Sequence, residues 1–271
     1  MPELPEVETT RRGIAPGITG RRVLAVDVRQ WVLRWPITAE LPAQVTGQAI
    51  HGIDRRGKYL LVRFESGTML VHLGMSGSLR LVSAAEPARR HDHVIWQLDN
   101  GLSLRLHDPR RFGSVLWTEE PPEQHPLLRD LGPEPLSAAF SAQYLKHLTA
   151  HRRAAIKTTL MDARVVVGVG NIYASEALFL AGIHPARASG RIALSRHEQL
   201  VTAVRQVLEE AIAAGGTTLR DFVGGDGRPG YFAQQLRVYG RASLPCRSCA
   251  APIRHLRQGQ RSSYFCARCQ K

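Results

Sequence analysis

Hydrophobic and polar residues alternate over short segments in the first half of the chain, which is typical of half-buried β-strands. Gly67, Gly77 and Asn100-Gly101 punctuate these segments as turns. The segments expected as strands are residues 23–28, 59–64, 68–73, 94–98, 102–106 and 113–117. The pattern predicts an antiparallel β-sandwich, preceded by an amphipathic helix from about Glu3 to Ile14 that ends before Pro16-Gly17.

The period becomes helical after a proline-rich, acidic stretch at residues 119–135, which we interpret as an interdomain linker. Helices are expected at residues 141–149, 154–162, 171–181 and 195–214. Gly168-Val169-Gly170 leads into the third of them and would expose backbone N–H groups to a phosphate, with Asn171 as cap or direct donor. Such a glycine pair is often only a tight turn. Residues 217–240 are rich in glycine and predict a mobile loop over a site.

The pattern predicts an α+β fold, and the composition indicates what the protein binds. The 271 residues include 36 Lys plus Arg against 23 Asp plus Glu, which gives a net charge of +13. A surface this basic attracts polyanions, and nucleic acid is the first candidate. Codon bias would explain arginine over lysine but not the excess of positive charge. No apolar run approaches the roughly 20 residues that cross a bilayer, so we expect no membrane and a cytoplasmic location at the chromosome.

All four cysteines lie near the C-terminal end, as Cys246-x2-Cys249 and Cys266-x2-Cys269. This spacing favours one structural, tetrahedral Zn²⁺ held by four thiolates, with no open position for a catalytic water. A pair of disulfides is the alternative, which a reducing compartment disfavours. The segment between the pairs predicts a hairpin, with residues 253–256 and 261–265 as its strands. His255 stands on this hairpin, and we expect it to face solvent.

The N-terminus carries the candidate chemistry. Removal of Met1, which is usual before proline, would make Pro2 a secondary amine that can form an imine with a carbon of aldehyde or acetal character. Glu3 and Glu6 stand next to it, one helical turn apart, as acid/base partners. Proline and acidic residues are also common in a first helical turn for structural reasons alone.

Six motifs, spread in order along the chain, resemble those of the formamidopyrimidine-DNA glycosylase family. They are Pro-Glu-Leu-Pro-Glu-Val-Glu-Thr at 2–9, Arg-Gly-Lys-Tyr-Leu at 56–60, His-Leu-Gly-Met-Ser-Gly at 72–77, Asp-Pro-Arg-Arg-Phe-Gly at 108–113, Val-Gly-Val-Gly-Asn-Ile-Tyr-Ala-Ser-Glu at 167–176, and the four-cysteine finger. The resemblance implies a bifunctional enzyme that removes 8-oxoguanine and ring-opened purines from duplex DNA. It also implies strand cleavage by β- and δ-elimination through a Schiff base.

The same resemblance implies roles for individual residues. Pro2 corresponds to the nucleophile, Glu3 to the acid/base that assists opening of the sugar ring, and Glu6 to a supporting carboxylate. Lys58, Asn171 and Arg261 correspond to phosphate-gripping residues, and Lys157 to a lysine linked to lesion handling. Three further side chains, Met75, Arg110 and Phe112, correspond to those that fill the gap left by the flipped nucleotide. From pattern alone, Met75 and Phe112 also fit ordinary packing.

The resemblance further implies a helix-two-turn-helix motif beside the zinc hairpin, with DNA held between the two halves. We therefore expect a catalytic β-sandwich domain at 1–132, a linker at 133–150, a helix-two-turn-helix domain with a lesion-capping loop at 151–240, and a zinc-finger hairpin at 241–271. A monomer is expected.

Three other hypotheses remain open. An endonuclease VIII-like glycosylase would act on oxidised pyrimidines, although Leu4 and Val7 favour the purine branch. A zinc-finger DNA-binding protein without catalysis would explain charge and cysteines but not Pro2 beside two carboxylates. A third hypothesis makes Lys58 or Lys157 the imine-forming amine.

Overall fold

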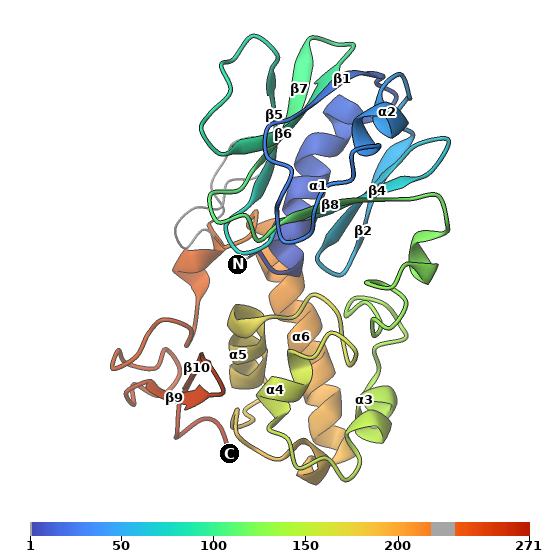
Figure 1. Cartoon of the computed structure of the whole chain (residues 1–271). Helices are drawn as coiled ribbons and strands as arrows, with labels where there is room; N and C mark the ends of the chain where they lie inside the picture. The colour runs from blue at the N-terminus through green and yellow to red at the C-terminus, as the bar shows by residue number, and fades with distance from the viewer. Residues whose placement is uncertain (1, 218–230) are drawn as a thin grey trace. The chain divides into compact units, whose positions relative to one another are not determined.

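The computed structural model describes residues 2–217 and 231–271, and the chain divides into two compact units (Figure 1). The first unit comprises residues 1–129 and 214–231, and the second comprises residues 130–213 and 232–271. Residues 218–230, which make up most of the expected lesion-capping loop, lie outside the described residues.

Two four-stranded antiparallel sheets build the first unit. One sheet has the order β1-β6-β7-β5, from β1 (Val23–Val28), β6 (Asp92–Leu98), β7 (Leu102–His107) and β5 (Ser78–Ser83). The other has the order β2-β3-β4-β8, from β2 (Gly52–Arg56), β3 (Tyr59–Arg63), β4 (Thr68–His72) and β8 (Ser114–Thr118). Two short helices, α2 (Leu41–Val45) and the 3₁₀ turn η1 (Pro122–Gln124), complete the unit.

Both sheets bury one face in a common apolar core, which also receives the N-terminal helix α1 (Leu4–Ile18). Leu60 and Val71 come from one sheet, Trp96 and Leu104 from the other, and each is at most 1% exposed. Every second residue of these strands is apolar, so the pleat places those side chains on the same face. The predicted β-sandwich is therefore confirmed.

Helix α1 is longer than the sequence predicts, because it continues through Pro16-Gly17 to Ile18. Proline removes one helical hydrogen bond, to the carbonyl four residues earlier. That carbonyl belongs to Arg12, on the exposed side, whereas Ile14 and Ile18 are fully buried. Burial of these two side chains compensates for the lost bond.

Two strands, β2 and β5, were missing from the sequence prediction. Strand β2 has one buried residue, Ile53, and otherwise polar or glycine positions, so its pattern is weak. In β5, Arg80 interrupts the apolar pattern but is itself buried, because it donates to the buried Asp92 carboxylate at 3.0 Å.

Helices are the main secondary structure of the second unit: α3 (Ala142–Thr149), α4 (Ile156–Leu160), α5 (Asn171–Leu180), the 3₁₀ turn η2 (Ser189–Arg191) and α6 (Leu194–Ala213). Helix α5 packs against α6 and is buried along most of its length. Between α4 and α5 the chain makes tight turns, in which Val165 and Val166 both donate to the Asp162 carbonyl. This is the expected helix-two-turn-helix region.

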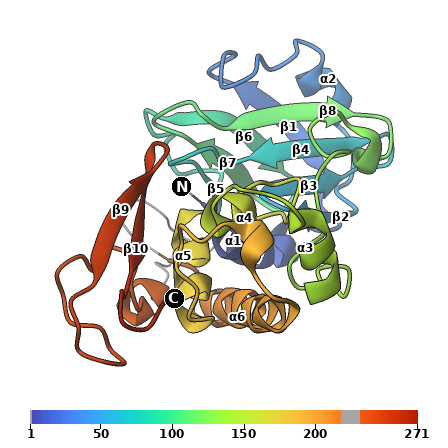
Figure 2. The same ribbon diagram turned by 90° about the horizontal axis from the view of Figure 1, so that it is seen from below.

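The hairpin formed by β9 (Arg254–Gln258) and β10 (Arg261–Phe265) lies beside α5 within the same unit (Figure 2). Its turn is shorter than predicted, since strand pairing extends to Gln258 and Gly259 adopts φ +59°. The mobile loop predicted over 217–240 is not found after residue 231. Residues 232–235 form the 3₁₀ turn η3 (Phe232–Gln235), and Phe232 and Val238 are fully buried.

Candidate active site and nucleic-acid interface

The candidate nucleophile, Pro2, lies two residues before Leu4, the first residue of α1, and is buried. Helix α1 begins with Pro5 in its first turn, where a missing N–H removes no helical bond. Glu3 occupies the N-cap position, and its backbone N–H donates to Glu6 Oε2 at 2.7 Å. Pro2 is thereby placed next to a helix start whose backbone the Glu6 carboxyl group holds in position.

The Glu6 carboxyl group holds two separate segments of the backbone by hydrogen bonds. It is 2% exposed, and its second oxygen, Oε1, accepts the backbone N–H of Thr217 at 2.8 Å. One side chain therefore ties the residue after Pro2 to the chain just before residues 218–230. Both oxygens of Glu6 are used as acceptors, which suits a supporting role more than a proton shuttle.

Lys58 lies in the turn between β2 and β3 and is half-buried. Gly57, with φ +56°, allows the tight turn that presents it. The side chain influences His72 on β4: burial, together with the charges of Lys58 and Arg34, lowers the pKa of His72 to about 4. His72 is thus neutral at pH 7, and its Nδ1 accepts the Gly74 N–H at 3.0 Å.

The three expected gap-filling residues lie on two neighbouring loops of the first unit. Met75 follows β4 and is 40% exposed, and Phe112 precedes β8 and is 44% exposed. Exposure of this size rules out ordinary core packing as the reason for these apolar side chains. The Arg110 guanidinium lies over the Phe112 ring, 4.8 Å from its centroid, so the two side chains support one another.

Lys157 is the most deeply buried cation among the predicted site residues. It projects from α4 and is only 1% exposed. Its Nζ donates to Asn171 Oδ1 at 2.6 Å, to the Ser262 carbonyl at 3.0 Å and to Ser263 Oγ at 2.7 Å. An ammonium has three donors, so these acceptors account for all of them. With its donors bonded, Lys157 is a poor candidate for the imine-forming amine.

The same contacts join three elements of the second unit. Asn171 is the first residue of α5 and donates through Nδ2 to the Tyr239 hydroxyl at 3.3 Å. Arg261 begins β10, immediately before the two serines that hold Lys157, and is exposed. The buried lysine therefore fixes the start of α5 relative to the hairpin that carries Arg261.

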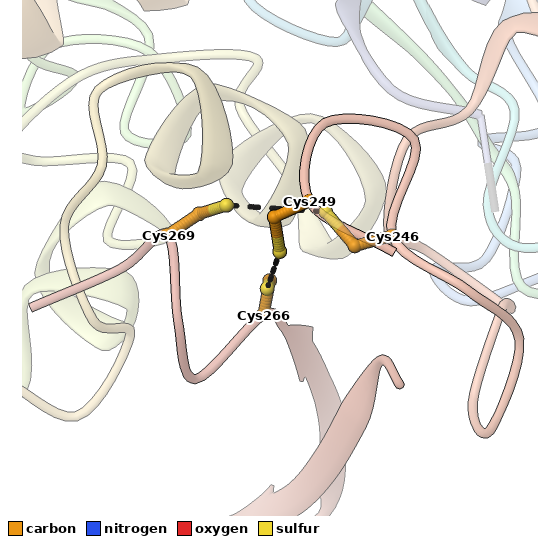
Figure 3. A group of neighbouring side chains, drawn as sticks. All are labelled: Cys246, Cys249, Cys266 and Cys269. Carbon is orange, nitrogen blue, oxygen red and sulfur yellow. Dashed lines mark hydrogen bonds between the residues drawn. The ribbon is translucent and has the colours of Figure 1, made fainter. Parts of the chain in front are cut away.

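The four cysteines converge on one point, as Figure 3 shows. Their sulfur atoms all lie within 4.8 Å of one another, with Cys246–Cys269 at 3.9 Å and Cys249–Cys266 at 3.5 Å. A tetrahedral zinc with bonds of about 2.3 Å needs sulfur–sulfur distances of about 3.8 Å, so the donor set fits. All four are free thiols, which excludes the disulfide alternative, and His255 is exposed and outside the cluster. The site is a structural zinc centre with four cysteine ligands.

Two buried carboxylates were missed by the sequence analysis as anchors of the site. Glu176 on α5 is fully buried and accepts the backbone N–H groups of Arg237, Val238 and Tyr239. It fixes the chain that follows residues 218–230. Asp108 is also fully buried, next to the gap-filling residues. Both stand inside the quoted motifs, but their burial was not readable from the pattern.

Comparison with known families assigns nearly the whole chain. Residues 1–115 match the formamidopyrimidine-DNA glycosylase N-terminal domain, and residues 131–223 match the formamidopyrimidine-DNA glycosylase H2TH domain. Residues 243–271 match the zinc finger found in FPG and IleRS.

Individual relatives agree over the full length. The formamidopyrimidine-DNA glycosylases of Methylococcus capsulatus and Thioalkalivibrio sulfidiphilus are each 58% identical over 271 residues, with both chains fully covered. Among solved structures, a Lactococcus lactis FPG mutant in complex with Fapy-dG-containing DNA gives a TM-score of 0.90 at 31% identity, with full coverage of both chains. The MutM (FPG) protein of Thermus thermophilus gives 0.87 at 37% identity, covering 99% of this chain and 98% of the other.

Within residues 2–217 and 231–271, the helices are all too short or too polar to cross a membrane.

Proposed function

The chain belongs to the formamidopyrimidine-DNA glycosylase family, and we propose that it excises 8-oxoguanine and formamidopyrimidines from duplex DNA and then cuts the abasic strand. The observation that carries this proposal is the agreement of all three family domains, in order, on a chain that keeps the Pro2-Glu3 opening. The enzyme acts as a monomer on chromosomal DNA in the cytoplasm.

The chemistry begins with the Pro2 nitrogen, once Met1 has been removed. Its lone pair forms a bond to C1′ of the lesion nucleotide while the glycosidic bond breaks and the base leaves with a proton. Glu3 gives a proton to the ring oxygen as the sugar opens, leaving an iminium ion. The positive end of α1 disfavours the ammonium form of Pro2 and so keeps the lone pair available.

Strand cleavage follows from the iminium ion. It acidifies the neighbouring C2′–H, and loss of that proton expels the 3′ phosphate by β-elimination. A second, δ-elimination expels the 5′ phosphate, and hydrolysis of the imine returns the amine. Glu3 handles the proton transfers, while Glu6 holds the N-terminal segment in place through its bonds to the Glu3 and Thr217 backbone N–H groups.

Recognition requires the damaged nucleotide to leave the helical stack, which costs a few kcal/mol. Met75, Arg110 and Phe112 are proposed to enter the vacated space, with Arg110 facing the orphaned base. Exposed apolar side chains are the wedges that DNA-bending proteins use for this purpose.

Phosphate contacts are proposed for Lys58, Asn171 and Arg261. Lys157 is proposed to act on DNA binding indirectly, by fixing Asn171 and the two serines that follow Arg261. The zinc supplies no chemistry of its own: the four thiolates would hold it as the structural centre of the hairpin. With this many cationic contacts, affinity should fall steeply with salt.

The discriminating experiment compares duplexes that carry 8-oxoguanine, a formamidopyrimidine or thymine glycol. We expect excision of the two purine lesions, with both elimination products on a denaturing gel, and N-terminal sequencing that begins at Pro2. Preferential attack on thymine glycol would favour an endonuclease VIII-like enzyme. Tight binding without any product would leave only a DNA-binding module.

A further inference from the structure

The loops that carry the gap-filling residues touch through their backbones. A Cβ added to Gly74 would lie 2.4 Å from the Phe112 carbonyl carbon and 2.5 Å from the Gly113 nitrogen. Gly74 also adopts φ +65°, a conformation that favours glycine. The loop before Met75 and the loop that ends with Phe112 are therefore packed without intervening side chains.

A single buried side chain also joins the two loops. The Asp108 carboxyl group accepts the Gly113 N–H through Oδ2 at 2.7 Å, which closes its own loop around Arg110 and Phe112. Its other oxygen, Oδ1, accepts the Ser76 hydroxyl at 3.4 Å, from the residue that follows Met75. Asp108 is 0% exposed, so these bonds are shielded from competing water.

The backbone of Asp108 is fixed as well. Its N–H donates to the His91 carbonyl at 3.0 Å, and its carbonyl accepts His93 Nε2 at 2.9 Å and the Arg111 N–H at 3.1 Å. The last bond holds Arg111 at φ +57°, a left-handed conformation unusual for a residue with a side chain. The carboxyl group thus projects from a point anchored to the sheet.

We propose that Asp108 is a positioning residue that locks the two loops into one rigid wedge, so that Met75, Arg110 and Phe112 enter the duplex as a unit. The inference rests on the proposed glycosylase function. Asp108 touches neither the lesion nor the nucleophile; it sets the geometry of the side chains that replace the flipped base. Misplacement of such groups by about 1 Å can lower a rate by roughly 100-fold.

Two substrates separate positioning from chemistry. Excision from an 8-oxoguanine duplex requires the wedge, whereas borohydride trapping on a single-stranded abasic oligonucleotide leaves no gap to fill. For Asp108→Ala we expect single-turnover excision to fall about 10- to 100-fold, while the trapping rate on the single strand stays close to that of the wild type. Asp108→Asn should recover most of the loss, because an amide can accept from Gly113 and donate to Ser76.

Gly74→Ala tests the same lock without altering Asp108, since its Cβ must push the loops apart. It decides the question if Asp108→Ala does not fold, as judged by thermal unfolding. Asp99→Ala, an exposed acid in the turn after β6, is the matched control and should leave both rates unchanged. A wild type inactive on every lesion would refute the proposed function instead.

The inference is overturned if Asp108→Ala and Gly74→Ala excise from duplex at the wild-type rate. It is also overturned if both rates fall in parallel, because that would indicate general damage to the fold. Failure of Asp108→Asn to recover activity would contradict the hydrogen-bonding account of the lock.

Discussion

The β-sandwich of the first unit and the zinc hairpin of the second are both antiparallel β structure, but different forces hold them. The sandwich buries apolar residues from two sheets and α1 in one large cluster. The hairpin region has only five buried apolar residues in its cluster, of which Cys246 and Cys266 are zinc ligands. A region with so small a core needs other bonds, and the metal centre and buried Lys157 provide them.

This difference separates two tasks. The N-terminal chemistry rests on a scaffold stabilised by apolar burial, which needs no metal. Asn171 and Arg261, two of the three residues proposed to grip phosphates, rest on a scaffold that depends on thiolates and on one buried ammonium. Each kind of support can therefore be removed separately.

Removal of the zinc, by chelation or by Cys249→Ser, should have the largest effect. Structural zinc contributes about 10–16 kcal/mol in isolated finger peptides, and the three buried residues of the cluster that are not zinc ligands, Phe179, Val238 and Ile253, cannot replace it. We expect residues 241–271 to lose hydrogen-exchange protection and DNA affinity to collapse. Protection in the β-sandwich should persist, and joint unfolding of both regions would contradict the comparison.

Leu60→Ala tests the other half of the comparison, the apolar core of the β-sandwich. Leu60 is fully buried between the sheets, and such a truncation costs about 2–5 kcal/mol through lost burial and a cavity. Denaturant unfolding should show this loss in the first unit. The zinc content, measured by a colorimetric chelator, should remain that of the wild type.

Lys157→Met should weaken the hairpin by about 1–3 kcal/mol, because Asn171 Oδ1, the Ser262 carbonyl and Ser263 Oγ would each lose the donor that Lys157 supplies. The measurements are hydrogen exchange, which should show less protection of β9 and β10, and the dependence of DNA affinity on salt concentration. Lys146→Met is the matched control, since Lys146 makes one bond, to the Ile192 carbonyl, and is only half-buried. Equal effects of both variants would remove the special role of Lys157.

The smallest effect concerns Glu8, an ion-paired group in the apolar unit. Burial raises its pKa, but hydrogen bonds from Arg11 and Arg12 and the charge of Arg55 outweigh it and lower the pKa to about 2. The folded state thus favours the carboxylate, and the stability it contributes is complete above pH 4.5 and lost as pH falls toward 2. With Arg12 mostly exposed and screened, we expect about 1–2 kcal/mol.

The measurement is the unfolding free energy of the wild type and Glu8→Gln across this range. Their difference should shrink as the pH falls, and a difference that does not change with pH would argue against the ion-pair account. Glu65→Gln, at an exposed site, is the control, and its unfolding free energy should depend on pH as that of the wild type does.

Much of the architecture was predictable because local pattern and global fold agree. Alternation located six strands, and the Cys-x2-Cys pairs located the metal site, since four thiolates at that spacing suit one tetrahedral ion. The end of α1 was not predictable, because it depends on the burial of Ile14 and Ile18 beneath sheets distant in sequence.

The residue types of the candidate site were predictable from the sequence, but the long-range hydrogen bonds that hold those residues in place were not. Spacing singled out Glu6 and the family resemblance singled out Lys157, yet the Glu6 bond to Thr217 spans 211 residues and the Lys157 bonds to β10 span over 100. Asp108 and Glu176 act through burial, which only tertiary structure creates. Residues 218–230 lie outside the described residues, so their expected role in capping the lesion stays a prediction.

The most direct test of the account is borohydride reduction during reaction with 8-oxoguanine duplex, followed by mass mapping of the adduct. We predict one covalent adduct on the Pro2 nitrogen, and its loss when Met1 is retained. An adduct on Lys58 or Lys157, or full strand cleavage by protein whose N-terminus is blocked, would contradict the account.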